Sequence, residues 1–67
     1  MTIAQLTKEI AKNNNNIRAT IEVMGREEWK EDEFVQGLLI DRFNILVEQK
    51  ELLREALEIT TRLEAVR

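Results

Sequence analysis

The side chains that most often carry out chemistry in proteins are scarce in this 67-residue sequence. It contains no His, no Cys and no Tyr. The most common general base, the thiolate nucleophile and the most common transition-metal ligands are therefore missing. Without Cys there is also no disulfide and no Cys-ligated zinc site. Carboxylates and amines are the reactive groups that remain.

The carboxylates of the second half of the chain follow a helical spacing. Asp41 and Glu48 lie seven residues apart, and Glu51, Glu55 and Glu58 fall on one side of a helix. Such a run is typical of the solvated face of an amphipathic helix. We therefore predict that the protein is not an enzyme and has no catalytic, cofactor-binding or metal site.

The first third of the chain has the apolar spacing of a helix that packs along one seam. Thr2 is a suitable N-cap, and Gly25 is a suitable left-handed C-cap. We predict a helix over about residues 2–24. Its seam, spaced alternately by three and four residues, consists of Ile3, Leu6, Ile10, Asn13, Ile17, Thr20 and Met24.

Four consecutive asparagines, Asn13 to Asn16, interrupt the composition of this helix. Their amides compete with the backbone for hydrogen bonds, so one interpretation is a kink or loop that ends a short first helix. The apolar spacing, however, continues through the run without a shift. We therefore favour a continuous helix, in which Asn13 lies on the seam and helps to set the register.

The second half of the chain predicts a longer helix over about residues 33–66 with two neighbouring apolar seams. What we call the outer seam consists of Val35, Leu38, Arg42, Ile45, Gln49, Leu52, Ala56, Ile59, Leu63 and Val66. What we call the inner seam consists of Leu39, Phe43, Leu46, Lys50, Leu53 and Leu57. One neighbouring helix cannot cover both seams.

The predicted connector, residues 25–32, is strongly acidic. Together with Glu33 it holds five acidic and two basic residues and accounts for the net charge of −3. One interpretation is structural, with Asp32 as N-cap of the second helix and Trp29 folded back over the end of the core. The alternative is a partner-docking tip. That tip would consist of Trp29, Glu27, Glu28, Glu31 and Asp32.

A short connector between two amphipathic helices predicts an antiparallel two-helix hairpin, and residues 1–67 form a single all-α domain in this interpretation. Aligning Met24 with Val35 makes the numbers of contacting residues sum to roughly 59. This register pairs Ile21 with Leu38, Ile10 with Gln49 and Ile3 with Ala56, so we expect the outer seam to face the first helix. The asparagine run then lies opposite Phe43 to Leu46, and the end of the longer helix has no neighbour.

The uncovered apolar surface leads us to predict a homodimer that forms a four-helix bundle. We expect Leu39, Phe43, Leu46 and Leu53 to lie near the axis of this bundle. The residues predicted for the dimer or partner interface are Leu39, Phe43, Leu46, Val47, Leu53, Leu57, Ile59, Leu63 and Val66.

We expect a small regulatory or adaptor protein that acts by helix-mediated binding of another protein, as an inhibitor, antagonist or co-chaperone. In length and layout the hairpin is similar in outline to the small helical co-chaperones of type III secretion needle subunits. The alternative is a dimeric hairpin that binds RNA or DNA through Lys8, Lys12 and Arg18, although the negative net charge weakens that interaction. The sequence shows no signal peptide or membrane span, so we expect a cytoplasmic protein.

Overall fold

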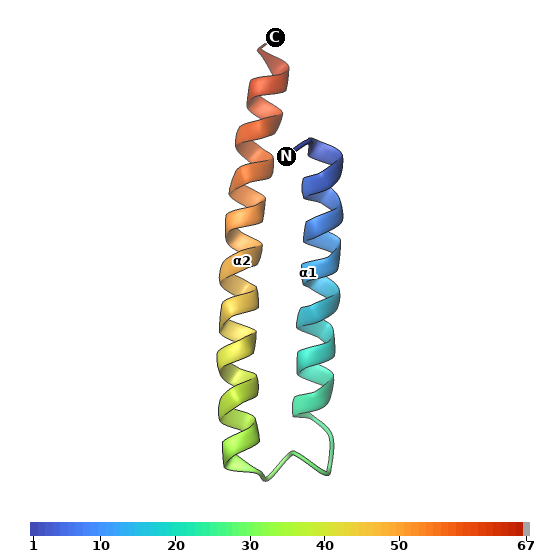
Figure 1. The fold of residues 1–67 in the computed structure, drawn as a ribbon, viewed down its shortest axis with the longest axis vertical. Coiled ribbons are helices and arrows are strands. Elements are labelled where there is room, and N and C mark those ends of the chain that lie inside the picture. The colour runs from blue at the N-terminus through green and yellow to red at the C-terminus, as the bar shows by residue number, and fades with distance from the viewer. Residues whose placement is uncertain (67) are drawn as a thin grey trace.

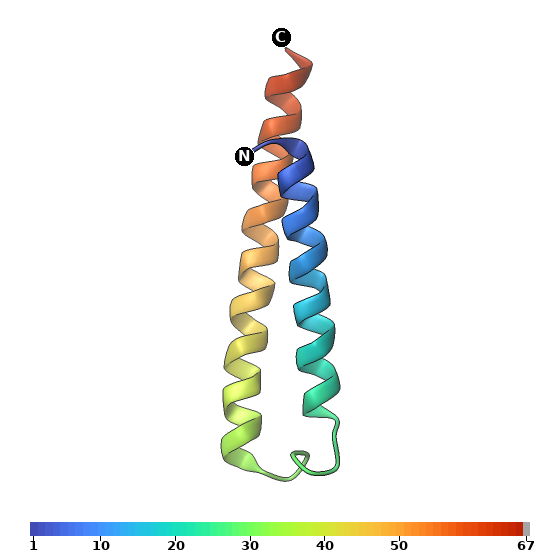
Figure 2. The ribbon, with the colours of Figure 1, turned by 45° about the vertical axis from the view of Figure 1, so that its right-hand side comes forward.

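The computed structural model describes residues 1–66, which form two helices that run antiparallel and side by side (Figures 1 and 2). Helix α1 spans Ile3–Met24 and helix α2 spans Glu33–Ala65. The chain is rod-shaped, with extents of 53 × 15 × 12 Å. The two helices confirm the prediction of an all-helical chain with two helices packed against each other. Neither described helix is long and apolar enough to cross a bilayer.

Helix α1 begins with a capping box between Thr2 and Gln5. The Gln5 N–H donates to the Thr2 hydroxyl at 3.1 Å, and the Thr2 N–H donates to the Gln5 side chain at 2.8 Å. The helix then continues without a break through Asn13 to Asn16. The prediction of a continuous helix is confirmed, because the seam on both sides of the asparagines packs against the same neighbour.

The prediction of a left-handed cap at Gly25 is wrong. Gly25 has φ −87° and ψ −4°, a right-handed conformation, and its N–H donates to the carbonyls of Ile21 and Glu22. The reason is that the chain keeps turning right-handed after the helix. The N–H groups of Trp29 and Lys30 both donate to the Arg26 carbonyl, at 3.1 and 2.9 Å. No reversal of the backbone is needed at the glycine.

Helix α2 begins at a side-chain cap, as predicted. The Asp32 carboxylate accepts the Val35 N–H at 3.1 Å. One turn further on, the Gln36 amide Nε2 donates to two main-chain carbonyls. One is that of Met24, the last residue of α1, at 3.1 Å, and the other is that of Trp29 in the connector, at 2.8 Å. Gln36 thus ties the end of α1 and the connector to the first turn of α2.

One buried hydrogen bond fixes the register of the two helices. Asn13 Nδ2 donates to the main-chain carbonyl of Leu46 at 3.0 Å, and this pair has the predicted sum of residue numbers. The polar middle of α1 therefore lies against the most apolar segment of α2, as predicted. At the other end, α2 extends well beyond the start of α1 (Figure 1).

The core between the helices is small. Among the large apolar side chains of the described residues, only Leu6 of α1 and Leu46 of α2 are buried. Asn13 and Thr20, on the same seam of α1 as Leu6, are buried as well. Leu6, Asn13 and Thr20 lie seven residues apart on α1, so half of the innermost layer is polar.

Candidate protein-interaction surface

A row of exposed apolar side chains runs along α2 and past its end. Its members lie seven residues apart and belong to the outer seam. They are Leu38, Ile45, Leu52, Ile59 and Val66, and each is more than half exposed. Residues at this spacing share one face of a helix, so the five side chains lie in one row along α2. We call it the exposed row.

The exposed row points in a different direction from the surface that contacts α1. On a coiled-coil helix the mean direction of the outer seam lies roughly 100° around the axis from that of the inner seam. The inner seam packs on α1, as the Asn13 to Leu46 contact shows. The outer seam therefore points away from α2 at nearly a right angle to the direction of α1.

The residues predicted for the interface separate into two groups in the structure. The first group lies within the hairpin: Leu46 is buried, and the half-buried members are Leu39, Phe43, Val47, Leu53 and Leu57. The second group, Ile59, Leu63 and Val66, is exposed near the end of α2.

The prediction left out the three exposed-row residues nearest the connector, namely Leu38, Ile45 and Leu52. The signal that identifies them is their unbroken seven-residue spacing with Ile59 and Val66, which places all five on one face. That spacing was visible in the sequence, but the predicted pairs placed the outer seam against α1. The structure reverses this assignment, because the inner-seam residue Leu46 is buried against α1 while Leu38 stays exposed.

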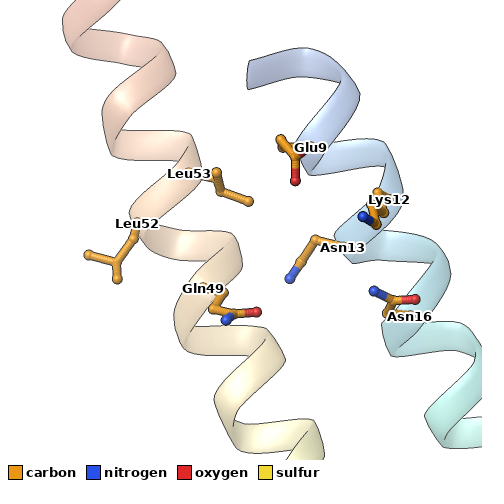
Figure 3. A pocket seen from close by; sticks show the side chains of 7 residues that line it. All are labelled: Glu9, Lys12, Asn13, Asn16, Gln49, Leu52 and Leu53. Carbon is orange, nitrogen blue, oxygen red and sulfur yellow. The ribbon is translucent and has the colours of Figure 1, made fainter. Parts of the chain in front are cut away.

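A groove between the helices shows which α1 side chains lie on the same face of the hairpin as the outer seam of α2. In Figure 3 Leu53 points toward α1, whereas Leu52 points away from it. The groove is lined by Glu9, Lys12, Asn13, Asn16, Gln49, Leu52 and Leu53. Polar side chains of α1 thus lie beside the outer-seam residues Gln49 and Leu52.

The amide of Asn13 is only partly satisfied in this groove. Its side chain is 5% exposed. The Nδ2 group has its acceptor, but the buried Oδ1 atom has no hydrogen-bond partner among the described residues. Leaving a buried acceptor unpaired costs on the order of 1–3 kcal/mol.

The acidic connector has mainly structural contacts. Asp32 caps α2, and the carbonyl of Trp29 accepts from Gln36. Trp29 is 38% exposed and belongs to the exposed large apolar residues. Glu27, Glu28 and Glu31 are exposed. In this arrangement the tip offers one partly covered aromatic ring among solvated carboxylates.

The carboxylates of α2 are exposed. Asp41, Glu48, Glu51 and Glu55 are exposed, and Glu58 is exposed while accepting a hydrogen bond from Arg62 at 2.6 Å. Within residues 1–66 no group of three or more acidic side chains is placed to hold a metal ion. Lys8, Lys12 and Arg18 are exposed on α1, where Glu9 and Glu22 are interspersed with them.

Comparisons with protein-family models, with curated proteins and with solved structures find no match to this chain. The surface itself offers one kind of interaction. Apolar side chains at coiled-coil spacing bind another helix with the same spacing, because each side chain inserts between residues of the facing helix.

Proposed function

We propose that this chain is a small non-enzymatic regulatory or adaptor protein that acts by helix-mediated protein–protein binding, and that it assembles as a homodimer in a four-helix bundle. The observation that carries the proposal is the exposed row on α2. Its five apolar side chains are each more than half exposed in the single hairpin. A row of exposed apolar side chains is typical of a surface that binds another protein.

The surface area of the hairpin supports this proposal. The chain exposes 5530 Å². A compact monomer of 7.9 kDa is expected to expose about 4,400 Å². The excess of about 1,100 Å² exceeds the roughly 800 Å² that each partner contributes to a standard protein–protein interface. A second chain of similar size can therefore cover the surplus.

The balance of buried and exposed apolar residues leads to the same conclusion. Two large apolar side chains are buried in the described residues, whereas twelve are exposed. Burial of five such side chains contributes on the order of 10 kcal/mol before the cost of association. That contribution is comparable to the whole stability of a typical small domain, about 5–15 kcal/mol.

The angle between the seams supports a bundle. Each helix of a four-helix bundle contacts two neighbours at nearly a right angle. The inner and outer seams of α2 are separated by roughly that angle. One neighbour is α1 of the same chain, and a helix of a second chain takes the other position.

The experiment compares Ile45→Lys and Leu52→Lys with the matched control Asn44→Lys, which adds the same charge at an exposed position outside both seams. Sedimentation velocity at micromolar concentration measures association, and circular dichroism measures helicity. We expect the two seam variants to dissociate to monomers and the control to associate like the unmodified chain. Equal association of all four proteins would refute the proposal.

A further inference from the structure

We propose that the outer seam of α2 packs antiparallel against the outer seam of a second copy, with the two-fold axis between residues 50 and 51. This inference rests on the proposed homodimer and specifies its interface and orientation. It makes α2 the central helix of the assembly, with α1 of the same chain on its inner seam and α2 of the second copy on its outer seam.

The spacing of the outer seam fits an antiparallel copy of itself. The seam alternates steps of three and four residues from Val35 to Val66 and begins and ends with a step of three. It therefore has the same spacing in both chain directions. Full overlap pairs Val35 with Val66, Leu38 with Leu63, Arg42 with Ile59, Ile45 with Ala56 and Gln49 with Leu52, each residue facing its counterpart in the second copy.

A parallel pairing of the same seams places Arg42 against Arg42 of the second copy. Two like charges would then be partly desolvated in one layer of the interface, which is unfavourable. In the antiparallel pairing each Arg42 faces Ile59 of the second copy instead. The aliphatic part of the Arg42 side chain can pack there while its guanidinium stays in water.

The position of α1 also favours the antiparallel arrangement. An axis perpendicular to the helices leaves both copies of α1 on the same side of the α2 pair, which closes a square bundle. An axis parallel to the helices would place them on opposite sides and leave each α1 with a single neighbour. Glu9 and Lys12 lie on the same face of the hairpin as Gln49 and Leu52. Because each copy contributes one Glu9 and one Lys12, two acids and two bases come together near the proposed axis.

The end of α2 supplies a further reason. The register set by Asn13 and Leu46 places residue 57 opposite the start of α1, and α2 continues past that point (Figure 1). The outer-seam residues Ile59, Leu63 and Val66 are exposed there. Antiparallel overlap places this segment on Arg42, Leu38 and Val35 of the second copy. The unpaired end of each chain thus covers the outer seam of the other chain near the connector.

Cysteine cross-linking tests the orientation, because the chain has no natural Cys. Leu38→Cys and Leu63→Cys are made separately, one with a short mass tag, and oxidised alone and as a mixture. Both positions are exposed, at 55% and 60%, so the hairpin tolerates the change. In the proposed dimer, residue 38 lies about 37 Å from its own copy, whereas a disulfide requires a Cα separation below about 7 Å.

We expect a covalent dimer from the mixture, at the combined mass of the tagged and untagged chains, and no covalent dimer from either variant alone. Glu51→Cys, on the solvated side of α2, is the control that stays uncross-linked. Cross-linking of Leu38→Cys with itself would establish a parallel pairing and overturn the inference. Reduced variants that sediment as dimers but never cross-link would overturn this interface and leave the proposed homodimer intact. Monomeric sedimentation of the unmodified chain would overturn both.

Discussion

Asn13 and Leu46 are joined by the buried hydrogen bond that sets how the two helices align. The Asn13 amide donates from Nδ2 to the Leu46 carbonyl at 3.0 Å, and a carbonyl inside a helix can accept this second bond with its remaining lone pair. A buried asparagine in a helical seam selects one register at a cost in stability. Here the cost is visible in the unpaired Asn13 Oδ1.

Replacing this amide should stabilise the hairpin. We expect Asn13→Leu to raise the free energy of unfolding by about 1–3 kcal/mol, because it removes the unpaired buried acceptor and adds apolar burial. Urea unfolding at a fixed protein concentration measures the change. Asn15→Leu is the control: it makes the same substitution at an exposed position and reports the gain from helix propensity alone. A smaller gain for Asn13→Leu than for Asn15→Leu would contradict this account of the buried amide.

The glycine substitutions follow from the observed backbone conformations. Gly25 has a negative φ, and a Cβ there would meet only ordinary contacts at 3.7 and 3.8 Å. We expect Gly25→Ala to be neutral or slightly stabilising, whereas a left-handed glycine would have made it costly. Thermal unfolding measures the difference. A loss above about 1 kcal/mol would show that the connector reverses its backbone at Gly25.

Gly37 offers a second substitution, because nothing lies within 4 Å of a Cβ built there. We expect Gly37→Ala to stabilise the protein by about 0.5–1 kcal/mol through helix propensity. The same unfolding experiment measures it. Destabilisation by this change would mean that another backbone approaches α2 at residue 37, a contact that the proposed dimer does not contain.

The cap at the start of α2 should contribute measurably to stability. Asp32→Ala removes the acceptor of the Val35 N–H and should lower the free energy of unfolding by about 1 kcal/mol. Glu31→Ala, which removes an exposed acid just before the cap, is the matched control and should have a much smaller effect. Equal losses from the two variants would mean that charge near the helix dipole matters more than the cap itself.

Gln36 should control the order of the connector. Gln36→Glu replaces the amide that donates to the carbonyls of Met24 and Trp29 with a carboxylate that repels both. We expect faster cleavage by trypsin after Arg26 and Lys30, because the connector opens more often. Asn44→Asp makes the equivalent amide-to-acid change at an exposed position and should leave the cleavage rate unchanged. Unaltered cleavage in Gln36→Glu would refute this role.

Much of the hairpin could be predicted because its signals are local. Thr2 and Asp32 are recognisable caps, and an apolar spacing that passes through the asparagines without a shift indicates one helix. The register followed from the connector length and is confirmed by the Asn13 to Leu46 hydrogen bond.

What could not be predicted depends on three-dimensional placement. The contacts of Gln36 with two carbonyls arise only once the connector has folded over the first turn of α2. The right-handed conformation of Gly25 depends on the right-handed turn that the connector makes directly after it. Choosing the seam that faces α1 required the rotation of α2 about its own axis, so residues such as Leu52 could not be assigned to the exposed row from spacing alone.

The mass of the unmodified chain in solution tests the central claim most directly. Sedimentation equilibrium over a range of micromolar concentrations should give twice the monomer mass of 7.9 kDa, with dissociation on dilution, because the exposed row is covered by a second copy. A single species at the monomer mass over that whole range would contradict the account.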